Sequence, residues 1–341
     1  MKLIDLRSDT VTRPGKEMLQ AMMDAQVGDD VFDEDPTVKQ LEEKAANLFG
    51  MEGGIFCPSG TMTNQIAIRI STLPQDEVIC DHRAHIYNYE AGGLAYNSLV
   101  SVKLLDGDRG RFTADDVKNN VRPDDIHAPR TSLVSIENTM NKGGGSYYTI
   151  DQIGSIAETC RELGLNFHLD GARVFNALVE TGESPEEYGQ YFDTISICLS
   201  KGLGAPIGSL LLGTKEHMKK AKRVRKVLGG GMRQVGYLAA AGIYALDHHI
   251  DRLREDHQKA RILGETLEAL PYVDSVMPVD TNIVIFSLEE GISTSEYLAE
   301  LDKKNIKAVP FGPNEIRFVT HLDFDDDMLS ETVKSLRQIT F

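Results

Sequence analysis

The sequence predicts an α/β fold, in which a large domain with a mostly parallel, seven-stranded sheet is followed by a small C-terminal α+β domain. Two observations predict this fold. Through the first two-thirds of the 341 residues, short β-rich runs alternate with helical patterns, and beyond residue 234 the pattern becomes long and helical and then mixed. We therefore expect a large domain at 1–250, including an N-terminal arm, and a small domain at 251–341.

Seven β-rich runs supply the strands of the expected large sheet, at 54–57, 78–81, 100–105, 133–137, 167–170, 194–199 and 209–213. Helical patterns lie between them, most clearly at 37–49, 61–70 and 150–163. Strands that alternate with helices usually pair in parallel, with helices on both faces of the sheet. Such sheets bind their ligands at the carboxyl ends of the strands, so we expect the functional site there.

The remaining runs predict the small domain. Residues 234–270 form one helical pattern that ends before Pro271, and we expect a long connector helix, straight or bent. Beyond it, strand-like runs at 282–288, 306–310 and 315–320 accompany helical runs at 295–305 and 325–336. This mixture is typical of a small α+β domain.

The composition excludes several classes of protein. A formal charge of −16 argues against general nucleic-acid binding, which needs a basic surface. No apolar run is long enough to span a bilayer and the chain does not begin with a signal-peptide pattern, so we expect a cytoplasmic protein without a membrane partner. The cysteines (Cys57, Cys80, Cys160 and Cys198) are widely spaced and form no C-x-x-C pair, which favours buried thiols over disulfides or a metal site.

A lysine and an aspartate follow two of the expected strands. The run 194–199 alternates and the glycines of KGLG end the pattern, so Lys201 lies at a strand end. Partial burial in such a position makes a neutral lysine amine available as a nucleophile or a base. Asp170 ends the run 167–170 in the same way, and a carboxylate there can face a protonated ring nitrogen, as pyridoxal phosphate requires when it acts as an electron sink.

Ser59, Gly60 and Thr61 stand at the start of the helical run 61–70. A helix start offers free backbone N–H groups and the positive end of the helix dipole, and both suit a phosphate. Ser and Thr are also preferred N-cap residues, so a simple helix cap explains the same residues. The residues themselves leave both interpretations open.

Arg173 and three histidines are further candidates. Arg173 follows Asp170 by three residues and either forms a structural ion pair or binds a phenolate oxygen of the cofactor or a substrate carboxylate. His85 and His127 lie near expected strand ends or loops, where an imidazole can stack on a cofactor or accept a proton from a hydroxyl, although a single histidine is more often an ordinary surface or core residue. His168 lies deeper on the strand face of Asp170, and we expect it to support that face by packing or a hydrogen bond.

Residues 215–226 hold seven Lys or Arg side chains against one Glu. This run ends in Lys226 and is followed by three glycines, 229–231, and by Arg233. A solvated helix face and a flexible turn are the ordinary explanations. The alternative is an anion-facing surface, in which the glycines allow a close backbone approach and Arg233 points at the anion.

Two familiar motifs are incomplete. Gly202-x-Gly204 has Ile207 where a dinucleotide fingerprint needs its third glycine, which argues against a nucleotide-binding dehydrogenase. The loop DGDRG at 106–110 supplies only two calcium ligands, because Arg111 and Val117 occupy the positions that a calcium loop gives to glycine and glutamate.

Taken together, the residues resemble low-specificity L-threonine aldolases, which are enzymes of fold type I (aspartate aminotransferase-like) that depend on pyridoxal 5'-phosphate (PLP). The resemblance covers nearly the whole chain in a fixed order of blocks: IDLRSDTVTRP (4–14), VGDDVFDEDPTV (27–38), PSGTMTNQ (58–65), SIENT (135–139), LDGARVFNA (169–177), ICLSKGLGAPIGS (197–209), GGGMRQ (229–234), AAAGIYAL (239–246) and RFVTHLD (317–323). It implies cleavage of L-threonine, L-allo-threonine and related β-hydroxy-α-amino acids to glycine and an aldehyde, in glycine biosynthesis and threonine catabolism. It also implies a homotetramer, a dimer of dimers with active sites at subunit interfaces.

The same resemblance implies roles for cofactor-binding residues. Lys201 corresponds to the lysine that binds PLP covalently, and Asp170 to the partner of the pyridine nitrogen. His85 corresponds to the histidine stacked on the ring, and Arg173 to the ligand of the phenolic oxygen. Gly60 and Thr61, with Ser59, correspond to the phosphate loop, and Lys226 and Arg233 to basic groups that reach the phosphate across a subunit interface.

For the substrate, the resemblance implies that Ser8, Arg173 and Arg317 bind the α-carboxylate and that His127 lies near the side-chain hydroxyl. Either His85 or His127, directly or through a water, would take the hydroxyl proton. Met140 replaces the histidine that usually follows ENT in this family. Another fold-type-I PLP lyase or an aminotransferase is the alternative within enzymes, and a PLP-binding regulator without turnover is the alternative outside them.

Overall fold

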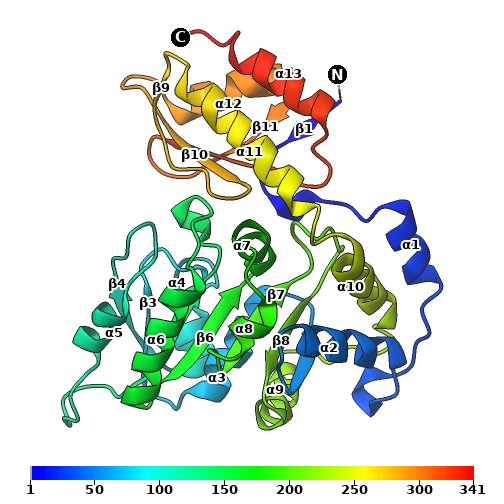
Figure 1. Ribbon diagram of the computed structural model, residues 1–341, viewed down its shortest axis with the longest axis vertical. Helices are drawn as coiled ribbons and strands as arrows, with labels where there is room; N and C mark the ends of the chain where they lie inside the picture. Colours follow the sequence, from blue (N-terminus) through cyan, green and yellow to red (C-terminus); the bar gives the residue numbers. More distant parts are fainter. Residues whose placement is uncertain (1) are drawn as a thin grey trace.

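A computed structural model describes residues 2–341 and shows two lobes (Figure 1). The lower lobe contains a seven-stranded sheet in the order β2-β8-β7-β6-β5-β3-β4. Its strands are β2 (Gly53–Cys57), β3 (Glu77–Asp81), β4 (Ser101–Leu105), β5 (Thr131–Glu137), β6 (Asn166–Gly171), β7 (Thr194–Cys198) and β8 (Ser209–Gly213). Only β8 runs against its neighbours in this sheet. The predicted mostly parallel, seven-stranded sheet is confirmed.

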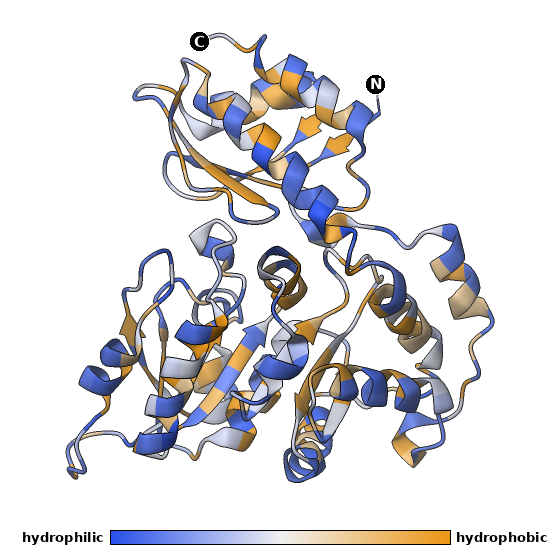
Figure 2. Cartoon of the chain, viewed as in Figure 1, coloured by the Kyte–Doolittle hydropathy of each residue, from blue (hydrophilic) through white to orange (hydrophobic). Residues whose placement is uncertain are grey.

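Helices cover both faces of this sheet. They are α1 (Lys16–Met23), α2 (Pro36–Leu48), α3 (Gly60–Ser71), α4 (His85–Asn88), α5 (Ala114–Asn120), α6 (Ile150–Leu163), α7 (Val174–Thr181), α8 (Pro185–Gly189), α9 (Lys215–Val227) and α10 (Gly236–His248). Local sequence sets their ends, as in α6, where Thr149 and Gln152 form a capping box and Gly164 ends the helix with a φ of +66°. Figure 2 shows apolar strands between helices whose outer faces are hydrophilic, which is the pattern of a sheet buried between two helical layers.

The upper lobe contains a four-stranded antiparallel sheet in the order β12-β13-β10-β9 and three helices. Its elements are β9 (Val273–Val276), β10 (Ile283–Leu288), β12 (Val309–Pro310), β13 (Glu315–Val319), α11 (Leu253–Glu268), α12 (Thr294–Lys303) and α13 (Asp326–Leu336). β1 (Ile4–Asp5) pairs in parallel with β11 (Ile306–Lys307), so the start of the described chain also lies in this lobe (Figure 1). The division of the chain at residues 250 and 251 stays a prediction.

The predicted single helix over 234–270 is wrong, because the chain forms α10 and α11 with a turn between them. At that turn His249 Nδ1 lies 2.7 Å from the carbonyl oxygen of Leu203, and Leu253 is fully buried beside Gly202. These contacts hold the turn against the large lobe and redirect the chain into the small one. Helical periodicity alone does not reveal such a tertiary anchor. The run 306–310 also divides, into β11 and β12, and β9 was not predicted because VDSV is short and polar.

Each lobe has its own apolar core. The large core lies between the sheet and its helices and includes Phe49, Phe56 and Phe167, whereas Phe286, Tyr297 and Phe318 are central to the small one. All four cysteines are buried free thiols, as the sequence predicts. Across residues 2–341, no helix has the length and apolar character needed to cross a membrane.

Candidate active site

The first turn of α3 packs against the carboxyl ends of β6 and β7. A Cβ atom on Gly60 would lie 2.6 Å from Cys198 Sγ, so glycine is needed for α3 to begin this close to β7. Further along the helix, the hydroxyl oxygens of Thr63 and Ser196 are 2.6 Å apart. The start of α3 therefore packs against the end of β7, the strand that leads to Lys201.

Ser59 is the N-cap of α3, and its hydroxyl accepts a hydrogen bond from the Met62 amide at 3.2 Å. The amides of Gly60 and Thr61 are the first in the helix and have no acceptor within it. A Cβ on Gly230 would clash with Met62, so the glycine turn after α9 also approaches this helix closely. The N-cap interpretation is thus confirmed, and it leaves the first amides of α3 available to a phosphate.

Asp170 is buried near the end of β6, beside Glu137 on β5 and Ser196 on β7. Its carboxylate accepts hydrogen bonds from the Ala172 amide at 3.2 Å and from Asn64 Nδ2 at 2.8 Å. Burial and the negative charge of Asp170 raise the pKa of the Glu137 carboxyl. A region where two acids repel each other in this way favours a nearby cation.

His168 supports this face through a hydrogen-bonded chain, as expected. Burial lowers the pKa of His168 to about 4, so the imidazole is neutral at physiological pH. Its Nε2 lies 3.2 Å from Asn64 Oδ1, and its Nδ1 lies 2.8 Å from the Thr194 hydroxyl and 3.2 Å from the Thr194 carbonyl oxygen. Because the Asn64 nitrogen donates to Asp170, Oδ1 is the atom that faces His168 and accepts from Nε2. His168 and Asp170 therefore fix the Asn64 amide together.

His85 begins α4 above the same strand ends. Its backbone amide donates to Glu137 Oε2 at 2.8 Å, and its Nδ1 donates to Glu90 Oε1 at 3.0 Å. Burial opposes protonation, but the hydrogen bond to Glu90 and the charges of Asp170, Glu137 and Glu90 together raise the pKa of His85. One side-chain atom each from His85, Glu90 and Asp170 lie within 4.8 Å of one another. Amide donors from Asn64 point at both carboxylates, which disfavours a metal ion between them.

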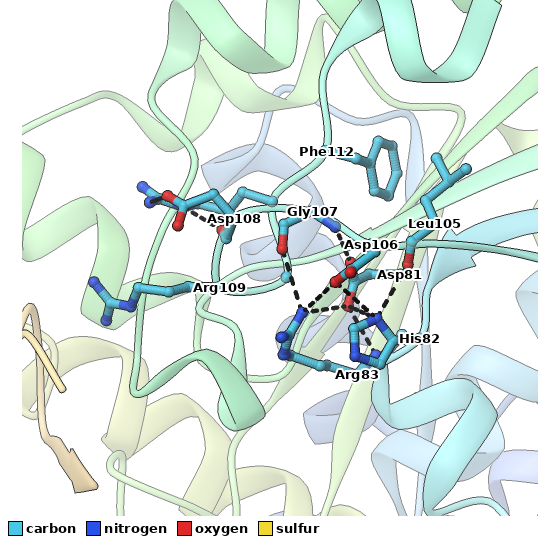
Figure 3. Close-up of polar contacts among 12 residues, drawn as sticks. Asp81, His82, Arg83, Leu105, Asp106, Gly107, Asp108, Arg109 and Phe112 are labelled. Atoms are coloured by element: carbon cyan, nitrogen blue, oxygen red, sulfur yellow. Dashed lines mark hydrogen bonds and ion pairs between the residues drawn. The ribbon is translucent and has the colours of Figure 1, made fainter. Parts of the chain in front are cut away.

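The turn before His85 is fixed by the carboxylate of Asp81, which ends β3 (Figure 3). Asp81 accepts from the amides of Arg83 and Gly107, both at 2.8 Å. Arg83 in turn donates to Asp106 at 3.2 Å, and the His82 amide donates to the Leu105 carbonyl at 2.9 Å. The DGDRG loop therefore anchors the segment that carries His85.

Lys201 is half-buried, three residues beyond the end of β7. The Thr12 hydroxyl donates to its carbonyl oxygen at 3.0 Å, so the N-terminal segment lies against it. Burial favours the neutral acid at Asp9, but nearby positive charge outweighs it. The pKa of Asp9 is lowered to about 2 by the charge and hydrogen bonds of Arg173 and by the charges of Lys201 and Arg317. Lys201 therefore shares one electrostatic environment with Asp9 and both arginines.

Arg173 is buried and forms a two-pronged ion pair with Asp9, at 2.8 and 2.7 Å. A structural ion pair is therefore present, but its carboxylate is Asp9 and not the nearby Asp170, and it leaves Nη1 of Arg173 outside the fork. Arg317 donates to Asn141 Oδ1 at 2.8 Å and to the Arg7 carbonyl at 2.9 Å, whereas its Nε is buried and has no partner within residues 2–341. Burial and the charge of Arg173 lower the pKa of Arg317 to about 10. Ser8, the neighbour of Asp9, accepts from the Thr10 amide at 3.2 Å.

Three expected site residues do not join this cluster within one chain. His127 lies in the loop before β5, at the amino end of a parallel strand, and its side chain is 85% exposed and bonded to Asp125 at 2.8 Å. Lys226 is exposed beside Gly231, and Arg233 pairs with Asp29 at 2.8 Å. Their roles across a subunit interface stay predictions.

Sequence reasoning missed several residues of the cluster. Asp9, Asn64 and Glu137 lie within the sequence blocks that carry the resemblance, and membership of those blocks is the signal that could have identified them as site residues. Glu90 stands in YEAGG and has no such signal. Met140 is buried against Gly110 and Gly143, so its side chain packs beneath the DGDRG loop.

Comparison with known proteins shows which sequences this chain is similar to. Residues 5–290 match the family described as Beta-eliminating lyase. The low specificity L-threonine aldolase of Escherichia coli (strain K12) is 44% identical over 338 residues, which cover 98% of this chain and 98% of that protein. The low-specificity L-threonine aldolase of Candida albicans is 41% identical over 338 residues, which cover 97% of this chain and 88% of that protein.

Solved structures share the fold. The threonine aldolase of Leishmania major matches with a TM-score of 0.86 and 22% identity, over 98% of this chain and 99% of that one. A putative L-allo-threonine aldolase of Listeria monocytogenes matches with a TM-score of 0.81 and 22% identity, over 98% of this chain and 96% of that one. The predicted fold-type-I architecture is confirmed.

Proposed function

Because the chain belongs to the Beta-eliminating lyase family, we propose that it is a PLP-dependent carbon–carbon lyase that cleaves L-threonine and L-allo-threonine to glycine and acetaldehyde. Related β-hydroxy-α-amino acids would give glycine and the corresponding aldehyde. The observation that carries the proposal is the meeting of Asp170, the Lys201 segment and the first turn of α3 at one edge of the sheet.

The residues at this edge fit PLP. Buried acids around Asp170 favour a cation, which suits a protonated pyridine nitrogen. The free amides of Gly60 and Thr61, at the positive end of α3, suit a phosphate. Arg317 Nε and Asn282 Oδ1 are buried polar atoms without partners among the described residues, and Nε is a donor suited to a carboxylate.

Each residue then has a definite task. When bound, PLP supplies an electron sink for the charge that develops at the substrate's α-carbon. Asp170 would keep a proton on the ring nitrogen, and Lys201 would supply the amine that holds the cofactor. Ser59, Gly60 and Thr61 would bind the phosphate, and His85 would stack on the ring.

The remaining residues act on the substrate. Arg317, with Ser8 and the free nitrogen of Arg173, binds the α-carboxylate. His85 or His127 takes the proton from the β-hydroxyl as the Cα–Cβ bond breaks. His127 can do so only from a neighbouring subunit or after a movement of its exposed loop, because it lies outside the cluster of its own chain. The homotetramer, the contribution of Lys226 and Arg233 to a neighbouring site, and a place in cytoplasmic threonine and glycine metabolism belong to the same proposal.

The test replaces Lys201 with alanine. The purified wild-type protein should absorb near about 420 nm, and borohydride reduction followed by mass spectrometry should find the cofactor on Lys201. K201A should lose that absorbance and all acetaldehyde release from the four threonine stereoisomers, whereas K118A, at an exposed lysine of α5, should keep both. Keto-acid formation in place of acetaldehyde would favour the aminotransferase alternative, and a cofactor trapped on another lysine would refute the assignment.

A further inference from the structure

Glu90 carries no role in the reaction as described so far, yet it is among the most enclosed charged groups of the site. It follows α4 in the turn that leads away from His85, and its side chain is fully buried. A carboxylate removed from water in this way is stable only when donors satisfy its oxygens.

Three donors converge on Glu90. Oε1 accepts from His85 Nδ1 at 3.0 Å and from Asn64 Nδ2 at 2.9 Å, and Oε2 accepts from Gln65 Nε2 at 2.6 Å. The amide nitrogens of Asn64 and Gln65 can only donate, so Glu90 accepts from both of them and can also accept from His85 Nδ1. Glu90 thus ties α3 to the turn that carries His85.

The orientation of Asn64 is set by its neighbours together. Its Oδ1 lies 3.2 Å from Nε2 of the neutral His168, and its nitrogen faces two carboxylates. That nitrogen donates to both Glu90 and Asp170, at 2.9 and 2.8 Å. The carboxylate beside His85 and the carboxylate expected at the ring nitrogen are therefore held by one amide.

We propose that Glu90 is a positioning residue for His85, whose imidazole it holds with the Nδ1 proton directed at Glu90 and with Nε2 left free for proton transfer with the substrate. A carboxylate on one ring nitrogen of a histidine fixes the tautomer and strengthens the other nitrogen as a base. The inference rests on the proposed function for the identity of the substrate. It favours His85 over His127 as the base, because His127 has only an exposed aspartate as its partner.

Other charged and titratable groups also face His85. Asp170 on β6 and Glu137 on β5 add negative charge, and the Tyr89 ring lies 5.6 Å from the imidazole between centroids, with Lys142 Nζ 5.5 Å from the Tyr89 ring. Glu90 differs from these groups because it alone forms a hydrogen bond with the imidazole of His85 among the described residues. Its removal should therefore change the tautomer of His85 as well as its charge.

The experiment compares wild type, E90Q, E90D and E180Q by NMR of protein carrying isotope-labelled histidine, with bound cofactor and after its removal. The His85 signal is assigned by its loss in H85N. E180Q is the matched control, because Glu180 makes the equivalent contact with His257 Nδ1 at 2.8 Å, in a pair that joins α7 to α11. E90Q should lower the pKa of His85 and alter its tautomer, whereas E180Q should alter only His257.

Kinetics supply the second measurement. In E90Q the low-pH limb of kcat/KM should move to lower pH and its plateau should fall roughly ten- to hundredfold, with E90D intermediate, because E90D keeps the charge on a shorter side chain. A folded E90Q with the tautomer and titration of wild-type His85 would overturn the proposal, even if activity fell. If E90Q does not fold, E90D carries the test, and an unchanged His85 signal in E90D overturns it. The NMR titration needs no substrate, so its result stands whether or not threonine proves to be the substrate.

Discussion

The ion pair between Asp9 and Arg173 gives the most direct test of how the site is built. Both side chains are almost fully removed from water, and two hydrogen bonds of 2.8 and 2.7 Å join them. D9N keeps the shape of the side chain but removes its charge, so the guanidinium of Arg173 stays buried without a counter-ion. Breaking a buried pair from one side destabilises a protein by about 3–5 kcal/mol.

The structure allows a separate estimate of the same quantity. Lowering the pKa of Asp9 from 3.8 to about 2 corresponds to about 2.4 kcal/mol in favour of the ionised form. Since the folded-state pKa is below the unfolded value, this stability is present above pH 3.8 and is lost as the pH falls through about 2. The deficit of D9N should therefore be about 2–5 kcal/mol and should not vary between pH 6 and 8.

The measurement is urea unfolding of wild type and D9N at equal protein and cofactor concentrations, because ligand and subunit binding shift apparent stability. E300Q is the matched control. It breaks the exposed pair of Glu300 and Lys303, which are 2.6 Å apart, and should change the free energy of unfolding by less than about 1 kcal/mol. A D9N protein no less stable than E300Q would refute the argument that Asp9 neutralises Arg173.

Two further predictions concern the start of α3 and the contact between α2 and β2. G60A should weaken PLP binding in a cofactor titration, because its Cβ would lie 2.6 Å from Cys198 Sγ. Adding C198A in the double variant should restore part of the loss. Equal PLP binding by G60A and wild type would contradict the clash. Glu42 accepts a hydrogen bond from the Phe56 amide at 2.8 Å, and burial raises the pKa of Glu42 to about 7. The stabilising contribution of Glu42 is therefore full below pH 4.5 and is lost as the pH rises to about 7 and above. E42Q keeps an acceptor without the charge, so its stability relative to wild type should increase between pH 5 and 8 in urea unfolding, and a pH-independent difference would contradict the argument.

Strand order explains what the sequence could predict about the site. Asp170 and Lys201 end neighbouring expected strands, and parallel strands bring their carboxyl ends to one edge, so their proximity follows from pattern alone. The same logic could have placed His127 at the opposite edge, because DDIHAPR precedes its strand. Asp9 could not be placed by pattern, since its partner Arg173 is 164 residues away and an isolated aspartate after a short strand has no periodicity.

The buried hydrogen-bond network was equally beyond sequence reasoning. Asn64 shares its helix face with the apolar residues Ala67 and Ile68, and only the packing of α3 across β6 and β7 brings its side chain to Asp170. His168 was expected to support Asp170, but the amide that connects them comes from another element. Sequence pattern assigns residues to elements, whereas these contacts depend on how the elements pack.

The N-terminal segment explains how two lobes can share one site. β1 adds to β11 in the small lobe, Asp9 pairs with Arg173, and Thr12 bonds to the carbonyl of Lys201 in the large lobe. Arg317, on β13 of the small lobe, lies close enough to Arg173 for their like charges to interact. The charges of three basic side chains thus act on the single carboxylate of Asp9, which leaves an excess of positive charge at the junction of the lobes. A substrate carboxylate bound there would relieve the repulsion between the two arginines, so the same residues that join the lobes would also favour an anionic substrate.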